Sequence, residues 1–253
     1  MLAPKAEPWP RWTQHDNGST AKIDHTMWTA FLATYVAGAD DGINRVRYAD
    51  VSAFDLKSLD EYLAYLTALP ISTYARLEQV PYWINLYNAR TVRLILAHYP
   101  ITSIMKLNIS PGWLSSGPWD KKLMTVEGID LSLNDIEHRI LRAGVSDNRI
   151  HYALNCASLG CPNLQPAAFT PDNMEDWLSG GARMYINHPR GVTIGDDGVV
   201  ASKIYAWFKQ DFGNDDRAVL DHLEMYADAP LKSALDEATS ILSYAYDWNL
   251  NDA

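Results

Sequence analysis

The sequence predicts a helix-dominated α+β fold with one small antiparallel or mixed sheet, and two observations carry this prediction. Several long segments place apolar residues three and four positions apart, the spacing that lines one face of an α-helix. Only short segments alternate apolar and polar residues, as a β-strand does, and turn residues bound them. The chain of 253 residues is long enough to bury a large core, and no linker rich in Gly or Ser divides it. We therefore expect an extended N-terminal arm over residues 1–20 and a single globular domain over residues 21–253.

Three helices are predicted in the first half. Asp24 can cap the first helix, whose apolar stripe consists of Trp28, Phe31, Leu32 and Tyr35. The second helix carries the stripe Leu59, Tyr62, Leu63 and Leu66, and Pro70 ends it. The third covers residues 81–99, with Pro81 in its first turn and Pro100 preventing its continuation.

Two carboxamides of the third helix, Asn85 and Asn88, share a face with Val92, Ile95 and Tyr99. If that face is buried, each carboxamide needs partners, because an unpaired buried amide costs about 1–3 kcal/mol. We therefore single out both residues as candidates for binding or orienting a partner group.

The second half alternates short strands with helices. A strand or hairpin is predicted near residues 122–130. A helix capped by Ser132 and Asp135 follows it and runs through Arg142, and Gly144 suits its C-terminal cap. Residues 149–155 alternate Ile150, Tyr152 and Leu154 with His151, Ala153 and Asn155, which predicts a strand. A hairpin is expected over residues 192–201, and helices over residues 171–187, 205–211, 216–226 and after Pro230.

Composition excludes some classes of function. The net charge of -10 argues against nucleic-acid binding, which needs a basic face. No apolar run approaches the roughly 20 residues that span a bilayer. The segment Leu2–Trp12 is rich in Pro and is typical of the start of a mature exported chain, so we expect an extracytoplasmic protein, periplasmic or secreted.

Two cysteines, Cys156 and Cys161, lie five positions apart after the predicted strand at residues 149–155. This spacing is longer than that of thioredoxin-like redox motifs and zinc knuckles. A local disulfide and a nucleophilic thiolate at Cys156 both remain open. If the disulfide forms, Cys161 is a structural cysteine bonded to Cys156.

A nucleophilic cysteine needs a base, and His138 and His151 are the two candidates. In an extended strand His151 would lie roughly 16 Å from Cys156 and on the opposite face. His151 can still belong to the site if the chain bends at Asn155, or if it points into a cleft that another element completes. Glu137 shares a helix stripe with apolar residues. It either pairs with an arginine such as Arg90 or Arg93, or orients a histidine as the acid of a Cys-His-acid arrangement.

Several common catalytic motifs are absent from the sequence. It contains no G-x-S-x-G elbow, no P-loop, no Rossmann glycine pattern and no H-E-x-x-H. Lys203 follows the predicted hairpin and is a candidate for holding an anionic group, although a solvated lysine would have the same pattern.

Five ordered blocks of the sequence resemble the family called domain of unknown function, number 547. They are YWINLYNA at 82–89, SLNDIEH at 132–138, RIHYALNCASLGCP at 149–162, SKIYAWFKQDF at 202–212 and YDWNLND at 246–252. The resemblance is good over about residues 70–212. It implies a bacterial secreted or periplasmic protein and a comparison with papain-like and transglutaminase-like cysteine hydrolases. On that comparison Cys156 is the nucleophile, His138 or His151 the base, and Glu137, Asn85 or Asn88 the orienting groups.

Our leading hypothesis is a cysteine-dependent hydrolase or acyl-transferase that acts on an amide or thioester and needs no cofactor. The assigned catalytic residues are Cys156, His138, His151 and Glu137, and the binding or orienting residues are Asn85, Asn88, Asn155 and Lys203. The alternative is a non-enzymatic extracytoplasmic binding domain with a Cys156–Cys161 disulfide and a structural buried polar network. Its partner would be a small molecule or a peptide, not nucleic acid. A metal site built from the histidines and thiols is a third option that the ligand spacing does not favour.

Overall fold

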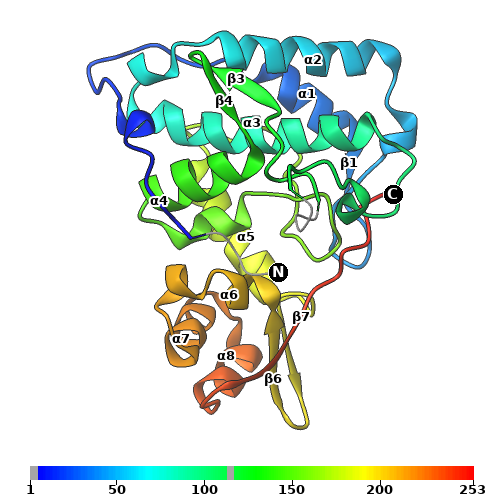
Figure 1. Ribbon diagram of the computed structural model, residues 1–253. Coiled ribbons are helices and arrows are strands. Elements are labelled where there is room, and N and C mark those ends of the chain that lie inside the picture. The colour runs from blue at the N-terminus through cyan, green and yellow to red at the C-terminus, as the bar shows by residue number, and fades with distance from the viewer. Residues whose placement is uncertain (1–4, 113–116) are drawn as a thin grey trace.

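The structure is a computed structural model that describes residues 5–112 and 117–253 (Figure 1). The helix-dominated α+β class is confirmed, with eight α-helices in the described ranges. The strands form three small sheets rather than one. Residues 1–4 of the expected arm lie outside the described residues, and the rest of the arm contains a short 3-10 helix, η1 (Pro10–Thr13).

Three helices make up the N-terminal layer: α1 (Thr26–Tyr35), α2 (Ala53–Ala68) and α3 (Arg76–Leu96). Helix α2 packs between the other two, and its N-terminus is capped by Ser52, whose hydroxyl accepts a hydrogen bond from the Asp55 N–H. Helix α3 begins five residues before the predicted start at Pro81 and is buried on nearly every side. It is therefore the central helix of the larger hydrophobic core, and Asn85 and Asn88 are both inside that core.

Short elements connect this layer to the rest of the chain. Strands β1 (Val36–Ala37) and β2 (Arg45–Val46) form one antiparallel pair, and β3 (Met124–Val126) and β4 (Ile129–Leu131) form another beside α2. Three 3-10 helices lie between them in the sequence: η2 (Tyr48–Asp50), η3 (Ile71–Thr73) and η4 (Ile104–Lys106).

The predicted capping box is present after β4. The Ser132 N–H donates to Asp135, and the Asp135 N–H donates to the Ser132 hydroxyl. The helix that follows is a π-helix, η5 (Asp135–Leu141), which continues into the short α4 (Arg142–Gly144). π-Helical turns are rare and often occur at functional sites.

The predicted strand at residues 149–155 is wrong. These residues form a 3-10 helix, η6 (Asn148–Tyr152), followed by a loop. The side chain of Asp147 accepts the Arg149 N–H and starts the turn. Ile150, His151 and Tyr152 are all buried, so the apolar–polar alternation did not mark one exposed and one buried face.

The C-terminal part has its own smaller core, built on α5 (Met174–Ile186), α6 (Lys203–Trp207), α7 (Asp216–Tyr226) and α8 (Ala229–Asp236). A further 3-10 helix, η7 (Lys209–Phe212), follows α6. The predicted hairpin is confirmed as β5 (Val192–Gly195) and β6 (Gly198–Ser202), and β7 (Ile241–Ala245) joins β6 in parallel.

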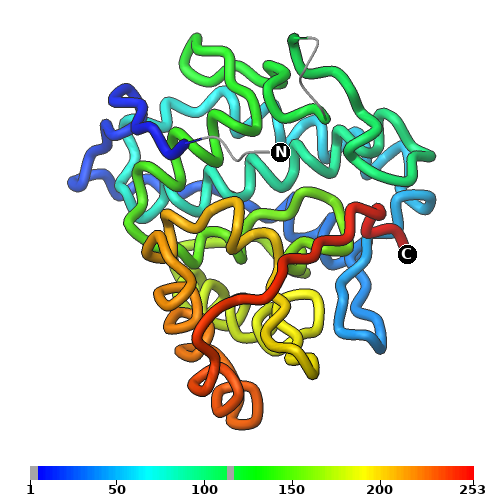
Figure 2. The backbone as a smooth tube through the Cα atoms, turned by 60° about the horizontal axis from the view of Figure 1, so that its bottom comes forward, coloured from blue at the N-terminus to red at the C-terminus, as the bar shows by residue number. Residues whose placement is uncertain are grey.

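After β7 the chain runs back across the molecule to the N-terminal layer, as the red segment in Figure 2 shows. Residues 246–252 form this returning segment. Backbone hydrogen bonds attach it to residues 157–160, to Thr102 and to Val46. The loop that carries both cysteines therefore lies beneath a segment from the far end of the chain.

Candidate functional site

The loop that carries the cysteines, residues 155–162, is shaped by two buried carboxamides. Asn88 on α3 donates to the Ala153 carbonyl at 2.8 Å and accepts the Asn155 N–H at 2.9 Å. Asn155 in turn donates to the Pro162 carbonyl and accepts the Ala157 N–H, which closes the loop around the two thiols. Ala157 has a positive φ of 59°, a conformation that side-chain-bearing residues adopt rarely and that marks local strain.

Both thiols are free, so the disulfide required by the alternative hypothesis is not formed in this structure. Cys156 is half-buried, and Cys161 is 3% exposed. The Cys156 N–H lies 2.9 Å from Cys161 Sγ, and the Tyr246 hydroxyl lies 3.1 Å from each sulfur. Ser158 Oγ lies 3.0 Å from the Tyr246 hydroxyl and 3.3 Å from Cys156 Sγ.

The two thiols differ in acidity. Burial opposes the thiolate of Cys161, but hydrogen bonds from Cys156, from Tyr246 and from the Cys156 N–H outweigh it and lower the pKa of Cys161 to about 7. The hydrogen bond to Cys161, together with burial, raises the pKa of Cys156 well above its ordinary value. The pair therefore releases its first proton near neutral pH, and the remaining charge resides on Cys161.

Tyr246 supplies the hydroxyl that the two thiols share. Burial raises the pKa of Tyr246 well above its ordinary value, so the hydroxyl keeps its proton and donates to the Cys161 thiolate. Its ring packs against Trp207 and Trp248, with centroids 4.9 and 4.7 Å away. We had assigned Tyr246 no role from the sequence, although it opens one of the five resembling blocks.

A second polar cluster lies between the two hydrophobic cores, around η5 and η6. Arg142 Nε donates to Asp211 at 2.6 Å, and His151 Nε2 donates to the same carboxylate at 2.7 Å. The ring of Phe208 stacks on His151, at 4.4 Å between centroids, and the Arg142 guanidinium lies over the same ring. We did not predict Arg142 or Asp211, because residues 69 positions apart show no joint pattern in a single sequence.

The predicted Cys-His pair is not present. No histidine in the described part of the chain hydrogen-bonds to Cys156 or Cys161, since His151 bonds to Asp211 and His138 to Arg142. Glu137 does not pair with Arg90 or Arg93 but accepts the Tyr87 hydroxyl at 3.0 Å, and burial raises its pKa. Among the described residues, no hydrogen bond joins these side chains to the thiol pair.

Asn85 and Lys203, which were also predicted to bind or orient a partner group, have no hydrogen bond to either thiol. Asn85 bonds to the backbone of Phe169 through both its amide nitrogen and its oxygen, and so it anchors a loop. Lys203 is exposed on α6, and its side chain has no ion pair with any described residue. No group of three His, Cys, Asp or Glu within residues 5–112 and 117–253 is arranged to hold a metal ion, so the third option has no support.

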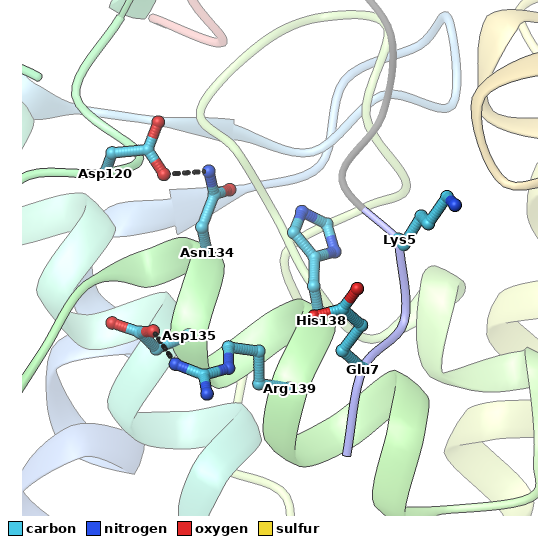
Figure 3. A pocket seen from close by; sticks show the side chains of 7 residues that line it. All are labelled: Lys5, Glu7, Asp120, Asn134, Asp135, His138 and Arg139. Atoms are coloured by element: carbon cyan, nitrogen blue, oxygen red, sulfur yellow. Dashed lines mark hydrogen bonds and ion pairs between the residues drawn. The ribbon is translucent and has the colours of Figure 1, made fainter. Parts of the chain in front are cut away.

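A polar pocket of about 320 Å³ opens beside η5, between that helix and the N-terminal arm (Figure 3). It is lined by the seven side chains that Figure 3 labels, including His138. The Cys156 and Cys161 side chains are not among them, so this pocket is distinct from the thiol pair.

One protein-family model matches the part of the chain that contains η5 and the cysteine loop, residues 155–162. Residues 71–186 match the model of the family described as "Protein of unknown function, DUF547", which supports the resemblance over that stretch. Asp211 and Tyr246 lie beyond it. No curated protein and no solved structure matches the chain.

In the described residues, no helix combines the length and apolar character needed to cross a membrane.

Proposed function

We propose that the protein is a cysteine-dependent hydrolase or acyl-transferase that acts on an amide or thioester, with Cys156 as the nucleophile and Cys161 as its base. The observation that carries the proposal is the unequal thiol pair. Cys161 has a pKa of about 7, because hydrogen bonds to its sulfur outweigh burial, and it is buried beside the more accessible Cys156. A thiolate with a pKa near the working pH is a suitable general base.

In the proposed reaction Cys156 Sγ attacks the substrate carbonyl carbon while its proton passes to the Cys161 thiolate. The carbonyl π electrons move to the oxygen, and the resulting oxyanion forms within reach of Ser158, whose hydroxyl lies 3.3 Å from Cys156 Sγ. The backbone N–H of Ser158 has no hydrogen-bond partner among the described residues, so it is a second donor for that oxygen.

When the intermediate collapses, the bond to the leaving amine or thiolate breaks, and Cys161 returns the proton to the leaving group. Water or another acceptor then attacks the acyl carbon of the Cys156 thioester while Cys161 accepts its proton. The bond between that carbon and Cys156 Sγ breaks, the acyl product leaves, and Cys161 returns the proton to Cys156, which restores the starting pair. The reaction type is the one that the resemblance to papain-like and transglutaminase-like hydrolases implies. The base differs, because a thiol takes the place of the histidine.

Acylation of the full-length protein by an activated thioester tests this proposal. Intact-mass spectrometry should show one acyl group, and peptide mapping should place it on Cys156. Cys156→Ser should remove the adduct, and Cys161→Ser should slow acylation by about 10²-fold or more, as expected for the loss of a general base. Equal acylation of the wild type and Cys161→Ser would contradict the assigned base, and acylation at other residues alone would contradict the nucleophile.

One observation favours a second candidate, a binding domain without catalysis. The groups around Asp211 have satisfied hydrogen bonds, as in a structural network that holds two parts of a fold together. This candidate predicts that no acyl adduct forms at Cys156 with any activated ester or thioester, even when both thiols react freely with alkylating reagents.

A further inference from the structure

Arg190 lies between α5 and β5 and bonds to the chain around Cys161. Its Nη1 donates to the Leu159 carbonyl at 3.1 Å, and its Nη2 donates to Asn163 Oδ1 at 2.6 Å. Leu159 comes two residues before Cys161 in the sequence, and Asn163 comes two residues after it. The guanidinium therefore holds the chain on both sides of the buried thiol.

The positive charge of Arg190 has no carboxylate partner among the described residues. The residue is half-buried, and its Nε is buried and bonds to no described residue. Asp41 is an acid whose charge acts on Arg190, but its carboxylate is already paired with Arg45. A partly buried charge without a counter-ion is costly, because the protein solvates it less well than water does. Another negative group is therefore needed to balance Arg190.

The negative group that faces Arg190 from the cysteine loop is the Cys161 thiolate. A charge on Cys161 favours the charged form of Arg190, and because the attraction is mutual, Arg190 favours the thiolate. The phenols of Tyr185 and Tyr246 also act on Arg190, but burial raises their pKa values well above the ordinary value. Both phenols are therefore uncharged at neutral pH.

Three further titratable groups lie around the thiols and Arg190. The phenols of Tyr48 and Tyr87 interact with both thiols, and burial raises their pKa values well above the ordinary value, so they stay uncharged. His188 Nδ1 accepts the Arg190 backbone N–H at 3.1 Å, and its Nε2 donates to the Asp41 carbonyl at 2.7 Å. In this arrangement the imidazole carries one proton and no charge. Arg190 is therefore the positive charge that faces the thiols.

We propose that Arg190 is a positioning residue for the thiol pair. Its guanidinium fixes the chain on both sides of Cys161 and supplies the positive charge that balances the Cys161 thiolate. The thiolate in turn is the counter-ion that Arg190 otherwise lacks. This role rests on the proposed function, in which Cys161 is the base, but the charge balance can be measured without any acyl transfer.

A pH titration of the thiol pair in the full chain tests this role. The readout is thiolate absorbance at about 240 nm, with a Cys156→Ser/Cys161→Ser double variant as the background. Arg190→Gln should raise the pKa of the first thiol proton by about 0.5–1 unit, because the nearby positive charge is lost. Arg190→Lys keeps the charge but not the forked guanidinium, and its pKa should stay within about 0.3 unit of wild type.

Two further variants keep the titration decisive. Arg190→Met is a second neutral variant in case Arg190→Gln does not fold, since its unbranched side chain can still pack over the Tyr185 ring, and the same rise is expected. Arg183→Gln is the matched control, because Arg183 is an exposed arginine on α5 that pairs with Asp228. It should leave the pKa of the thiol pair unchanged.

Two results would overturn the role of Arg190. One is a pKa in the neutral variants equal to that of wild type, and the other is an equal rise in Arg190→Lys and Arg190→Gln. Acylation of the same proteins separates this role from the proposed reaction. A raised pKa in Arg190→Gln without any acyl-Cys156 adduct in wild type supports the charge balance and contradicts the reaction. An adduct in wild type with an unchanged pKa in Arg190→Gln does the reverse.

Discussion

The two thiols have the same chemistry in isolation, and their neighbours make them different. Cys161 Sγ receives the Cys156 N–H and the Tyr246 hydroxyl, both of which stabilise a thiolate. Cys156 is the more exposed of the two residues, and no backbone N–H of the described residues donates to its sulfur. The more acidic thiol, Cys161, and the more accessible one, Cys156, are therefore different residues. Cys161 can act as the base while Cys156 acts as the nucleophile.

Tyr246→Phe should raise the pKa of the thiol pair. The substitution keeps the aromatic packing and removes one hydrogen bond to a charged sulfur, a bond that contributes about 1.5–3 kcal/mol, or about one to two pKa units. Thiolate absorbance near 240 nm, followed against pH, measures the change. Tyr226→Phe is the matched control, since the Tyr226 hydroxyl bonds to no described residue. Identical titrations for Tyr246→Phe and wild type would show that this hydroxyl does not act on the thiols.

At the scale of elements, a helix and a loop build the thiol site together. Helix α3 supplies Asn88, whose side chain replaces the backbone partners that residues 153–155 would have had in a strand. This explains how the chain leaves η6 and turns into the cysteine loop without leaving buried backbone groups unpaired.

Asn88→Ala should reduce the free energy of unfolding by about 2–4 kcal/mol, because it leaves the Ala153 carbonyl and the Asn155 N–H unpaired inside the core. Urea unfolding followed by Trp fluorescence measures the loss. The control is Asn249→Ala, an exposed carboxamide whose side chain bonds to no described residue. A loss below about 0.5 kcal/mol would mean that Asn88 does not hold the loop.

The sequence alone predicts the elements better than it predicts their contacts. The apolar stripes of α1 and α2 and the turn between β5 and β6 follow from local spacing, and all three are present. Residues 149–155 were assigned the wrong element because both faces of η6 are buried, so alternation carries no information there. Asn85 and Asn88 were predicted to need partners, and both have them. Asp211 and Tyr246 come from distant segments, and a single sequence does not show such pairings.

At the scale of the whole molecule, Asp211 connects the two cores. It lies on η7, beside the smaller core, and binds Arg142 and His151 from the segment between the two cores. Burial opposes its ionisation, but the hydrogen bonds from His151 and Arg142 outweigh burial and lower the pKa of Asp211 to about 2. The unfolded value is higher, so the ionised carboxylate adds about 2 kcal/mol of stability, which is present above about pH 5 and lost as the pH falls towards 2.

Asp211→Asn should therefore destabilise the protein most at neutral pH, by about 3–5 kcal/mol, since the buried Arg142 loses a charged partner. The difference in unfolding free energy between wild type and Asp211→Asn should narrow by about 1 kcal/mol between pH 6 and pH 3. Urea unfolding at both pH values measures it, with the exposed Asp236→Asn as the control. A difference that stays constant with pH would contradict the low pKa of Asp211.

The most direct test of the reactive thiol pair is the pH dependence of Cys156 alkylation by iodoacetamide, measured by peptide mass spectrometry in wild type and in Cys161→Ser. We expect wild-type Cys156 to react without prior reduction, with a midpoint near the Cys161 pKa of about 7. In Cys161→Ser the midpoint should rise to about 8.5 or above, because the neighbouring base is gone. The same midpoint in both proteins, or no reaction in wild type until a reductant is added, would contradict it.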